Sequence, residues 1–175
     1  MHMKKDSYQP DKKLVAVCGL FCPGCRIFIA QRESPENRRN LAENFQIPVE
    51  AVKCDGCRAE NRFPYCETCK MAACAEKKGL EFCVECEEYP CTPLKEFQAA
   101  RPHRIELWQA QSRIKEVGYE RWFKEMLEHY SCARCGGINS AYHLVCRDCG
   151  AAPSCAYVDL HQAEIVAYLS SSTQQ

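Results

Sequence analysis

The sequence predicts a small, metal-stabilised α+β fold in which an irregular cysteine-rich domain with short helices precedes a helical connector and a terminal four-cysteine ribbon. Three observations support this prediction. The 175 residues include 16 cysteines, helical periodicity is concentrated between about residues 94 and 130, and four late cysteines form two close pairs. A chain of this length makes one conventional domain or two small ones. Because the clear apolar runs lie in its middle, we expect metal binding to help fold the first half.

Most of the cysteines stand in C-x2-C pairs. The pairs are Cys22/Cys25, Cys54/Cys57, Cys66/Cys69, Cys83/Cys86, Cys132/Cys135 and Cys146/Cys149. Two thiolates on one tight turn supply half of a tetrahedral metal site, and a secreted disulfide framework does not need this repeat. The basic N-terminus lacks the apolar core of a secretory signal, and no stretch approaches about 18 consecutive apolar residues. We therefore expect a cytoplasmic protein with no membrane partner and with reduced, metal-binding thiols.

Short helices are expected between the cysteine turns of residues 14–93, the predicted first domain. Segment 25–33, CRIFIAQRE, predicts one helix. The next segment has Ser34 as N-cap and Pro35 at the first helical position, and it stops before Pro48. Segment 69–80, CKMAACAEKKGL, predicts a helix that ends at Gly79, since glycine readily takes the left-handed conformation at a helix C-terminus.

Residues 94–130 are predicted to form an amphipathic helical connector, divided at Gly118. Apolar side chains recur at spacings of three and four, namely Ile105, Trp108, Tyr119, Trp122, Phe123, Met126, Leu127 and Tyr130. We interpret this stripe as core packed against the metal-binding modules rather than as a partner-binding face. Residues 156–170 predict a last helix with inward Val158, Ile165, Val166 and Leu169, and we expect the final SSSTQQ to fray.

Residues 131–155 carry the strongest local signal, C-x2-C-x10-C-x2-C. Its cysteines are Cys132, Cys135, Cys146 and Cys149. Gly136 and Gly150 follow the two pairs and permit the positive φ with which backbone N–H groups turn toward thiolate sulfurs. The segment INSAYHLV between the pairs predicts a small hairpin. This spacing predicts a zinc ribbon, and four thiolates leave no open coordination position, so the zinc should be structural. A rubredoxin-like iron site is the alternative.

Eleven further cysteines are predicted metal ligands. They are Cys18, Cys22, Cys25, Cys54, Cys57, Cys66, Cys69, Cys74, Cys83, Cys86 and Cys91. Sequence proximity groups the four from 54 to 69 and the four from 74 to 91, and it leaves the first three without a fourth partner. Interleaved pairing stays open. The fourth ligand of the first three is either Cys155 or a thiolate borrowed from another site, or else the three hold a cluster with one open position.

The metal of residues 18–91 is expected to be zinc, with [4Fe–4S] clusters for electron transfer as the alternative, because thiolate ligands suit both. The spacing C-x3-C-x2-C at residues 18–25 resembles the cluster motif of radical S-adenosylmethionine enzymes. No run of alternating strands and helices follows it, so we do not expect an enzyme of that class.

The cysteine-rich part also resembles a widespread bacterial and archaeal family of unknown function. The resemblance rests on CGLFCPGC, KCDGCRAE and YCETCKMAACAEKKGLEFCVECEEYPCTPLKEF, in that order, and covers about residues 15–97. It implies metal binding, taken as zinc, and no established reaction. It marks as ligands the cysteines between 18 and 91, although Cys66 matches less securely and Tyr89 stands where phenylalanine is frequent.

Charge argues against a polyanionic partner. Lys and Arg total 23, as do Asp and Glu, so the chain has no net field that would attract nucleic acid. We expect a non-enzymatic accessory or interaction protein with a protein partner. A ribbon-mediated nucleic-acid adaptor is the remaining alternative.

Overall fold

A computed structural model describes residues 3–33 and 35–172, and the chain it shows is mostly helical. In this part of the chain, β structure is limited to isolated bridges, which join Lys4 to Gly137, Val15 to Phe21 and Ser131 to Ile138. The prediction of an α+β fold is therefore wrong in its β part. None of the helices in these two ranges is long and apolar enough to span a membrane.

Most elements follow one another with short connections, and the long loops of residues 130–155 separate α7 from α8. The α-helices are α1 (Arg26–Glu33), α2 (Pro35–Phe45), α3 (Pro64–Glu67), α4 (Lys70–Lys78), α5 (Thr92–Ala99), α6 (Leu107–Val117), α7 (Tyr119–His129), α8 (Ala156–Leu160) and α9 (Gln162–Ser172). Short 3-10 turns are η1 (Lys5–Ser7), η2 (Lys12–Leu14), η3 (Cys22–Gly24), η4 (Val49–Ala51), η5 (Cys83–Glu85) and η6 (Pro102–Arg104).

Helices α1, α2 and α4 form where their sequences predict them. Helix α2 begins at Pro35 and ends at Phe45, before Pro48. Its predicted cap, Ser34, lies outside the described residues. Helix α4 ends at Gly79, whose φ of +66° lets its N–H reach carbonyls of the last turn.

Gly118 separates α6 from α7 as predicted, with φ at +79°. The aromatic stripe of α7 is core: Trp122 and Phe123 are fully buried, and the Phe123 ring meets Phe21 edge to face at 5.2 Å. Phe21 comes from the loop that carries the first cysteines. The connector therefore packs directly against the cysteine-rich part.

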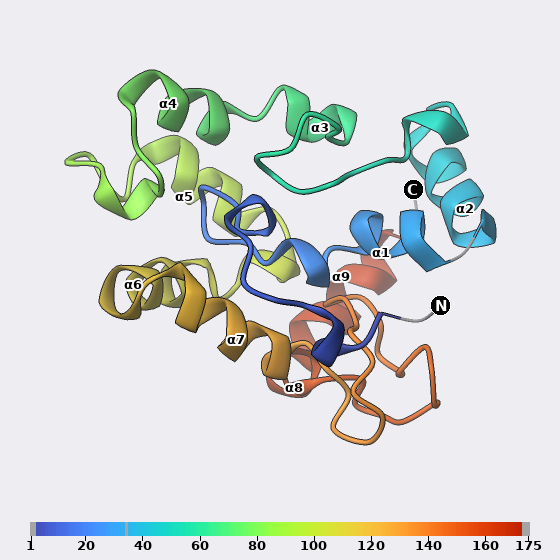
Figure 1. Ribbon diagram of the computed structural model, residues 1–175. Helices are drawn as coiled ribbons and strands as arrows, with labels where there is room; N and C mark the ends of the chain where they lie inside the picture. The colour runs from blue at the N-terminus through green and yellow to red at the C-terminus, as the bar shows by residue number, and fades with distance from the viewer. Residues whose placement is uncertain (1–2, 34, 173–175) are drawn as a thin grey trace.

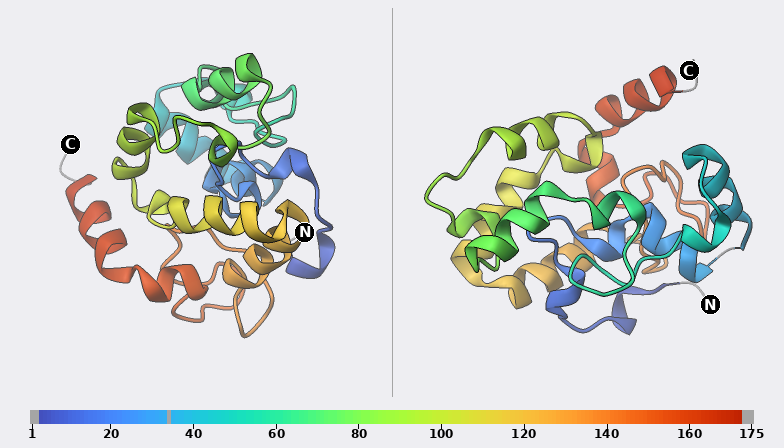
Figure 2. Two further views of the ribbon diagram at one scale, coloured as in Figure 1. Left: turned by 90° about the vertical axis from the view of Figure 1, so that its left-hand side faces the viewer. Right: turned by 90° about the horizontal axis from the view of Figure 1, so that it is seen from above.

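The C-terminal segment forms two helices instead of one. Val158 and Ile165 are buried as predicted. The prediction for Val166 is wrong, because its side chain is 40% exposed and follows Ile165 directly instead of lying three or four positions away on the same helix face. Helix α9 continues through Ser172, so the first half of SSSTQQ is helical, and residues 173–175 lie outside the described residues. Figure 2 shows the end of α9 standing clear of the rest of the molecule.

The end of the N-terminal segment, residues 14–18, is buried inside the molecule. It runs between the layer of α3 and α4 on one side and helices α6 and α7 on the other (Figure 1). One hydrophobic cluster joins Val15 and Phe21 of this segment to Trp122, Ile138 and Tyr157. The core is thus shared by parts of the chain that are far apart in sequence.

Candidate metal centre

The four cysteines of the terminal loops come together in one cluster. All four sulfurs lie within 4.8 Å of one another. The Sγ atoms of Cys132 and Cys149 are 3.7 Å apart, as are those of Cys135 and Cys146. A zinc ion at about 2.3 Å from each of four tetrahedral sulfurs sets them roughly 3.8 Å apart. The cluster therefore has the size that one tetrahedral ion requires.

The two halves of this cluster repeat the same backbone turn. Gly136 N–H donates to the carbonyl of Cys132 at 2.8 Å, and Gly150 N–H donates to the carbonyl of Cys146 at 2.9 Å. Both glycines have the predicted positive φ, +71° and +72°. Other backbone N–H groups donate to the sulfurs: that of Gly137 to Cys135, and those of Asp148 and Cys149 to Cys146.

The predicted hairpin between the two pairs does not form, and Asn139 explains why. Its buried amide, 1% exposed, donates to the carbonyls of Gly137 at 3.0 Å and Ser154 at 3.2 Å, and its oxygen accepts the Arg147 N–H at 3.2 Å. A side chain thus satisfies backbone groups that a strand ladder would otherwise pair. The same amide lies 3.5 Å from the Cys146 sulfur. Asn139 is a supporting residue that sequence reasoning missed.

Hydrogen-bond donors favour a thiolate at Cys146. Burial raises the pKa of its thiol, but N–H groups of Asp148 and Cys149 and the Asn139 amide outweigh burial and lower the pKa to about 7. Burial and the neighbouring thiols raise the pKa of Cys135 to about 12. Cys146 is therefore a ready thiolate, whereas a bound cation would have to displace the proton of Cys135.

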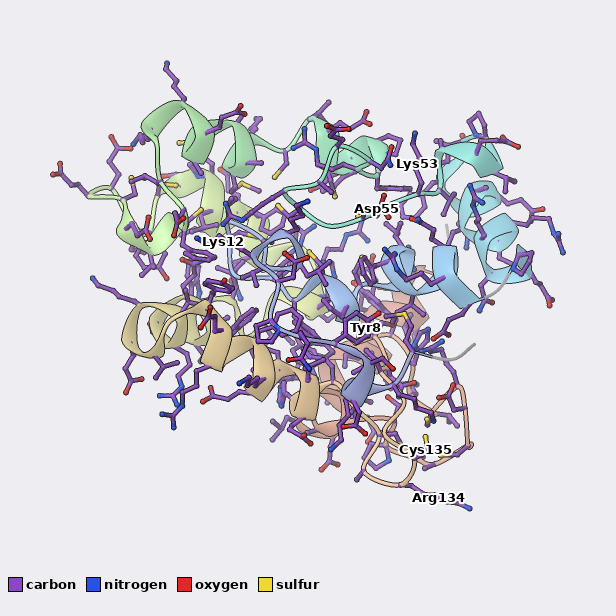
Figure 3. All side chains as sticks on the ribbon, viewed as in Figure 1. Tyr8, Lys12, Lys53, Asp55, Arg134 and Cys135 are labelled. Carbon is purple, nitrogen blue, oxygen red and sulfur yellow. The ribbon has the colours of Figure 1, made fainter. Side chains whose placement is uncertain are left out.

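The N-terminus anchors these loops. The Lys4 ammonium donates to the carbonyl of Cys135 at 2.9 Å and pairs with Asp148 at 3.1 Å. Arg147 forms an ion pair with Glu33 at the end of α1, and the two side chains are 14% and 4% exposed. Figure 3 shows Cys135 in a loop at one end of the molecule, with Arg134 directed outward. These contacts join residues more than a hundred positions apart, and no local pattern predicts them.

The first cysteines share their surroundings with cysteines of the next motifs. Burial, together with the charges of Cys25 and Cys54, raises the pKa of Cys66 to about 12. Burial also raises the pKa of Cys22, and Cys57 and Cys54 add to the effect. Cys22, Cys25, Cys54 and Cys66 are therefore neighbours.

A second neighbourhood surrounds Cys18. Burial raises the pKa of this thiol well above its usual value, and the charges of Cys57, Cys83 and Cys69 act in the same direction. Cys83 in turn interacts with Cys91, Cys74, Cys69 and Cys86. Cys18 and Cys69 thus lie among cysteines of other motifs, in contrast to the grouping by sequence proximity, whereas the four cysteines from 74 to 91 do line one cavity.

These N-terminal sulfurs are less closely gathered than the terminal four. Throughout residues 3–33 and 35–172, the terminal cluster is the one set of three or more Cys, His, Asp or Glu ligand atoms that lie within 4.8 Å of one another. The structure therefore brings the N-terminal cysteines into common regions without arranging them around one ion.

Backbone N–H groups in and beside the first two cysteine motifs donate hydrogen bonds to these thiols. The Cys57 N–H donates to the Cys22 sulfur, and the Val17 N–H donates to the Cys57 sulfur. Gly56, between Cys54 and Cys57, has φ at +123°, and a Cβ there would collide with the carbonyl oxygen of Lys13. The glycine of KCDGC is needed for this close approach.

Gln111 of α6 holds two cysteine loops together. Its buried amide donates to the carbonyl of Val17 at 3.0 Å and accepts the Val84 N–H at 2.7 Å. Val17 precedes Cys18, and Val84 follows Cys83. This glutamine is a second supporting residue that sequence reasoning missed, because nothing in a helical polar residue reveals that it is buried.

Four cysteines line a cavity of about 270 Å³ between α4 and α5. They are Cys74, Cys83, Cys86 and Cys91. Lys70 and Lys78 also line it, and the Lys78 ammonium lies 3.3 Å from the Cys86 sulfur and 2.8 Å from a carboxylate oxygen of Glu88.

Cys155 and the histidines that the structure describes are placed outside these groups. Cys155 is buried in the shared core, where the Ser154 hydroxyl donates to its sulfur at 3.7 Å. His129 and His161 both contact the carboxylate of Glu106, at 2.8 and 2.7 Å. His143 accepts the Ser140 N–H through Nδ1 at 3.0 Å.

Comparisons with known proteins support the resemblance over the cysteine-rich part. Residues 14–96 match the family described as Protein of unknown function (DUF3795). The match covers just under half of the chain, and it ends before the terminal cysteine cluster. No curated protein and no solved structure matches the chain. The correspondence of individual motifs stays a prediction.

Proposed function

We propose that this chain is a cysteine-thiolate metal-binding protein whose terminal cluster holds one structural zinc ion. The observation that carries the proposal is the gathering of the Cys132, Cys135, Cys146 and Cys149 sulfurs within 4.8 Å. Four protein thiolates fill a tetrahedral coordination shell, so a zinc ion there has no position for a substrate or an activated water. Its role is to hold together loops that have no strand ladder.

The wider role that we propose is that of a non-enzymatic accessory or interaction protein of the cytoplasm. The equal numbers of acidic and basic residues favour a protein partner over nucleic acid. The partial cover of the terminal cluster by the N-terminal segment and by α1 favours a structural metal over an exchangeable one.

Metal analysis of matched variants tests the zinc proposal. Wild-type protein and a Cys135→Ser variant are purified anaerobically, and zinc and iron per chain are measured. The variant should contain one zinc ion fewer than the wild type. Cys155→Ser is the control, because it also removes a cysteine sulfur but lies outside the cluster, and it should keep the wild-type zinc content. If Cys135→Ser loses iron instead, the rubredoxin-like alternative is correct.

A further inference from the structure

We propose that the cavity between α4 and α5 binds a [4Fe–4S] cluster through Cys74, Cys83, Cys86 and Cys91. This inference goes beyond the zinc proposal, since it concerns four different cysteines in a different part of the chain.

The spacing of the sulfurs distinguishes the two kinds of site. No three of the cavity cysteines bring their sulfurs within 4.8 Å of one another, whereas all four terminal sulfurs meet that limit. One ion at about 2.3 Å from each sulfur needs the closer arrangement. A cubane cluster needs sulfurs that lie farther apart, because each cysteine binds a different iron.

The volume of the cavity is also suited to a polynuclear group. The cavity measures about 270 Å³, while a single buried water needs only about 10–15 Å³. Apolar side chains supply most of the remaining wall, among them Met71, Leu80, Tyr89 and Leu94. A thiolate-lined, largely apolar space that is much larger than one ion matches the chemistry of an iron–sulfur cluster.

The charges around the cavity partly compensate a cluster with four thiolate ligands, which is negative overall. Lys70 and Lys78 reach the cavity from α4, against one carboxylate, Glu88. Cys91 is the N-cap residue of α5, an eight-residue helix, so the positive end of that helix lies beside its thiolate. Cys74 is exposed, which places one edge of the site at the surface.

Anaerobic reconstitution with ferric iron, sulfide and a thiol reductant tests this inference. Wild-type protein should become brown, with absorbance near about 400 nm that fades on reduction with dithionite. Cys86→Ser and Cys91→Ser should each contain about four fewer iron and four fewer sulfide ions per chain than the wild type. Cys155→Ser and Cys135→Ser, which do not alter the cavity, should keep the wild-type iron and sulfide contents.

Two outcomes would overturn the inference. One is equal iron and sulfide in the wild type and both cavity variants. The other is a cavity that takes up zinc and no iron. Because Cys135→Ser reports on the terminal zinc alone, failure of either proposal leaves the other measurable.

An alkylation experiment on the wild-type protein tests the same inference without relying on whether the variants fold. Iodoacetamide should alkylate the exposed Cys74 in protein without metal and should fail to do so after reconstitution. Equal alkylation of Cys74 in both states would also refute cluster binding at this cavity.

Discussion

Replacing Gln111 with leucine should destabilise the protein by about 2–4 kcal/mol, although the residue touches no metal ligand. The Val84 N–H has its hydrogen bond to the Gln111 oxygen at 2.7 Å, and losing this partner in a buried place costs about 1–3 kcal/mol. The Val17 carbonyl accepts a second hydrogen bond from the Cys83 N–H at 2.8 Å, so losing the glutamine there removes only about 0.5–1.5 kcal/mol.

Urea unfolding of the metal-loaded protein, followed by tryptophan fluorescence, measures this effect. With a slope of about 2 kcal/mol per molar urea, the midpoint should fall by about 1–2 M. Gln109→Leu is the matched control, because Gln109 lies exposed on the same helix and its replacement should change stability by less than about 0.5 kcal/mol. Equal midpoints for the two variants would show that Gln111 does not hold the cysteine loops together.

Three further predictions concern single residues. Asn139→Asp should weaken zinc binding by about 10–100-fold, because it places a carboxylate beside the Cys146 sulfur and removes the hydrogen bonds that the Asn139 amide donates. A competition assay with a chromophoric chelator measures this affinity. Unchanged affinity would contradict the supporting role of Asn139. Burial, with the charges of nearby arginines, lowers the pKa of His103 to about 3, so the folded protein binds fewer protons than the unfolded chain below about pH 6.5, and its stability should fall with acid. Relative to His103→Gln, the wild type should lose about 1.6 kcal/mol of unfolding free energy between pH 6.5 and 5 in urea unfolding, and parallel curves for the two proteins would refute this. Gly79→Ala should lower the free energy of unfolding by about 1–2 kcal/mol, since Gly79 has a positive φ in open space. Gly56→Ala should lower the thermal midpoint further than Gly79→Ala does, because a Cβ at position 56 would collide with Lys13. Similar midpoints for the two variants would show that the close approach of Gly56 to Lys13 is unimportant.

The local elements of this fold could be predicted from sequence because their causes are local. Pro35 and Gly79 mark the ends of helices, Gly118 divides α6 from α7, and the glycines after the terminal pairs take the predicted positive φ. The gathering of the terminal four sulfurs also agrees with their spacing. In each case, a few neighbouring residues determine the backbone.

The missed features depend on contacts between distant residues. The hairpin between the terminal pairs is replaced by a loop because Asn139 binds backbone groups on both sides of it. The interleaving of Cys18 with Cys57 and Cys83 depends on how three loops pack, which spacing along the chain does not report. The inward course of the N-terminal segment likewise becomes visible only in three dimensions.

Native mass spectrometry of anaerobically purified protein tests the central claim most directly, because it counts metal ions on each intact chain. Wild-type protein is compared with a variant in which Cys132 and Cys149, whose sulfurs are 3.7 Å apart, are both alanine. The proposed terminal site predicts a mass difference of one zinc ion beyond the change in side chains. Identical zinc contents would contradict it.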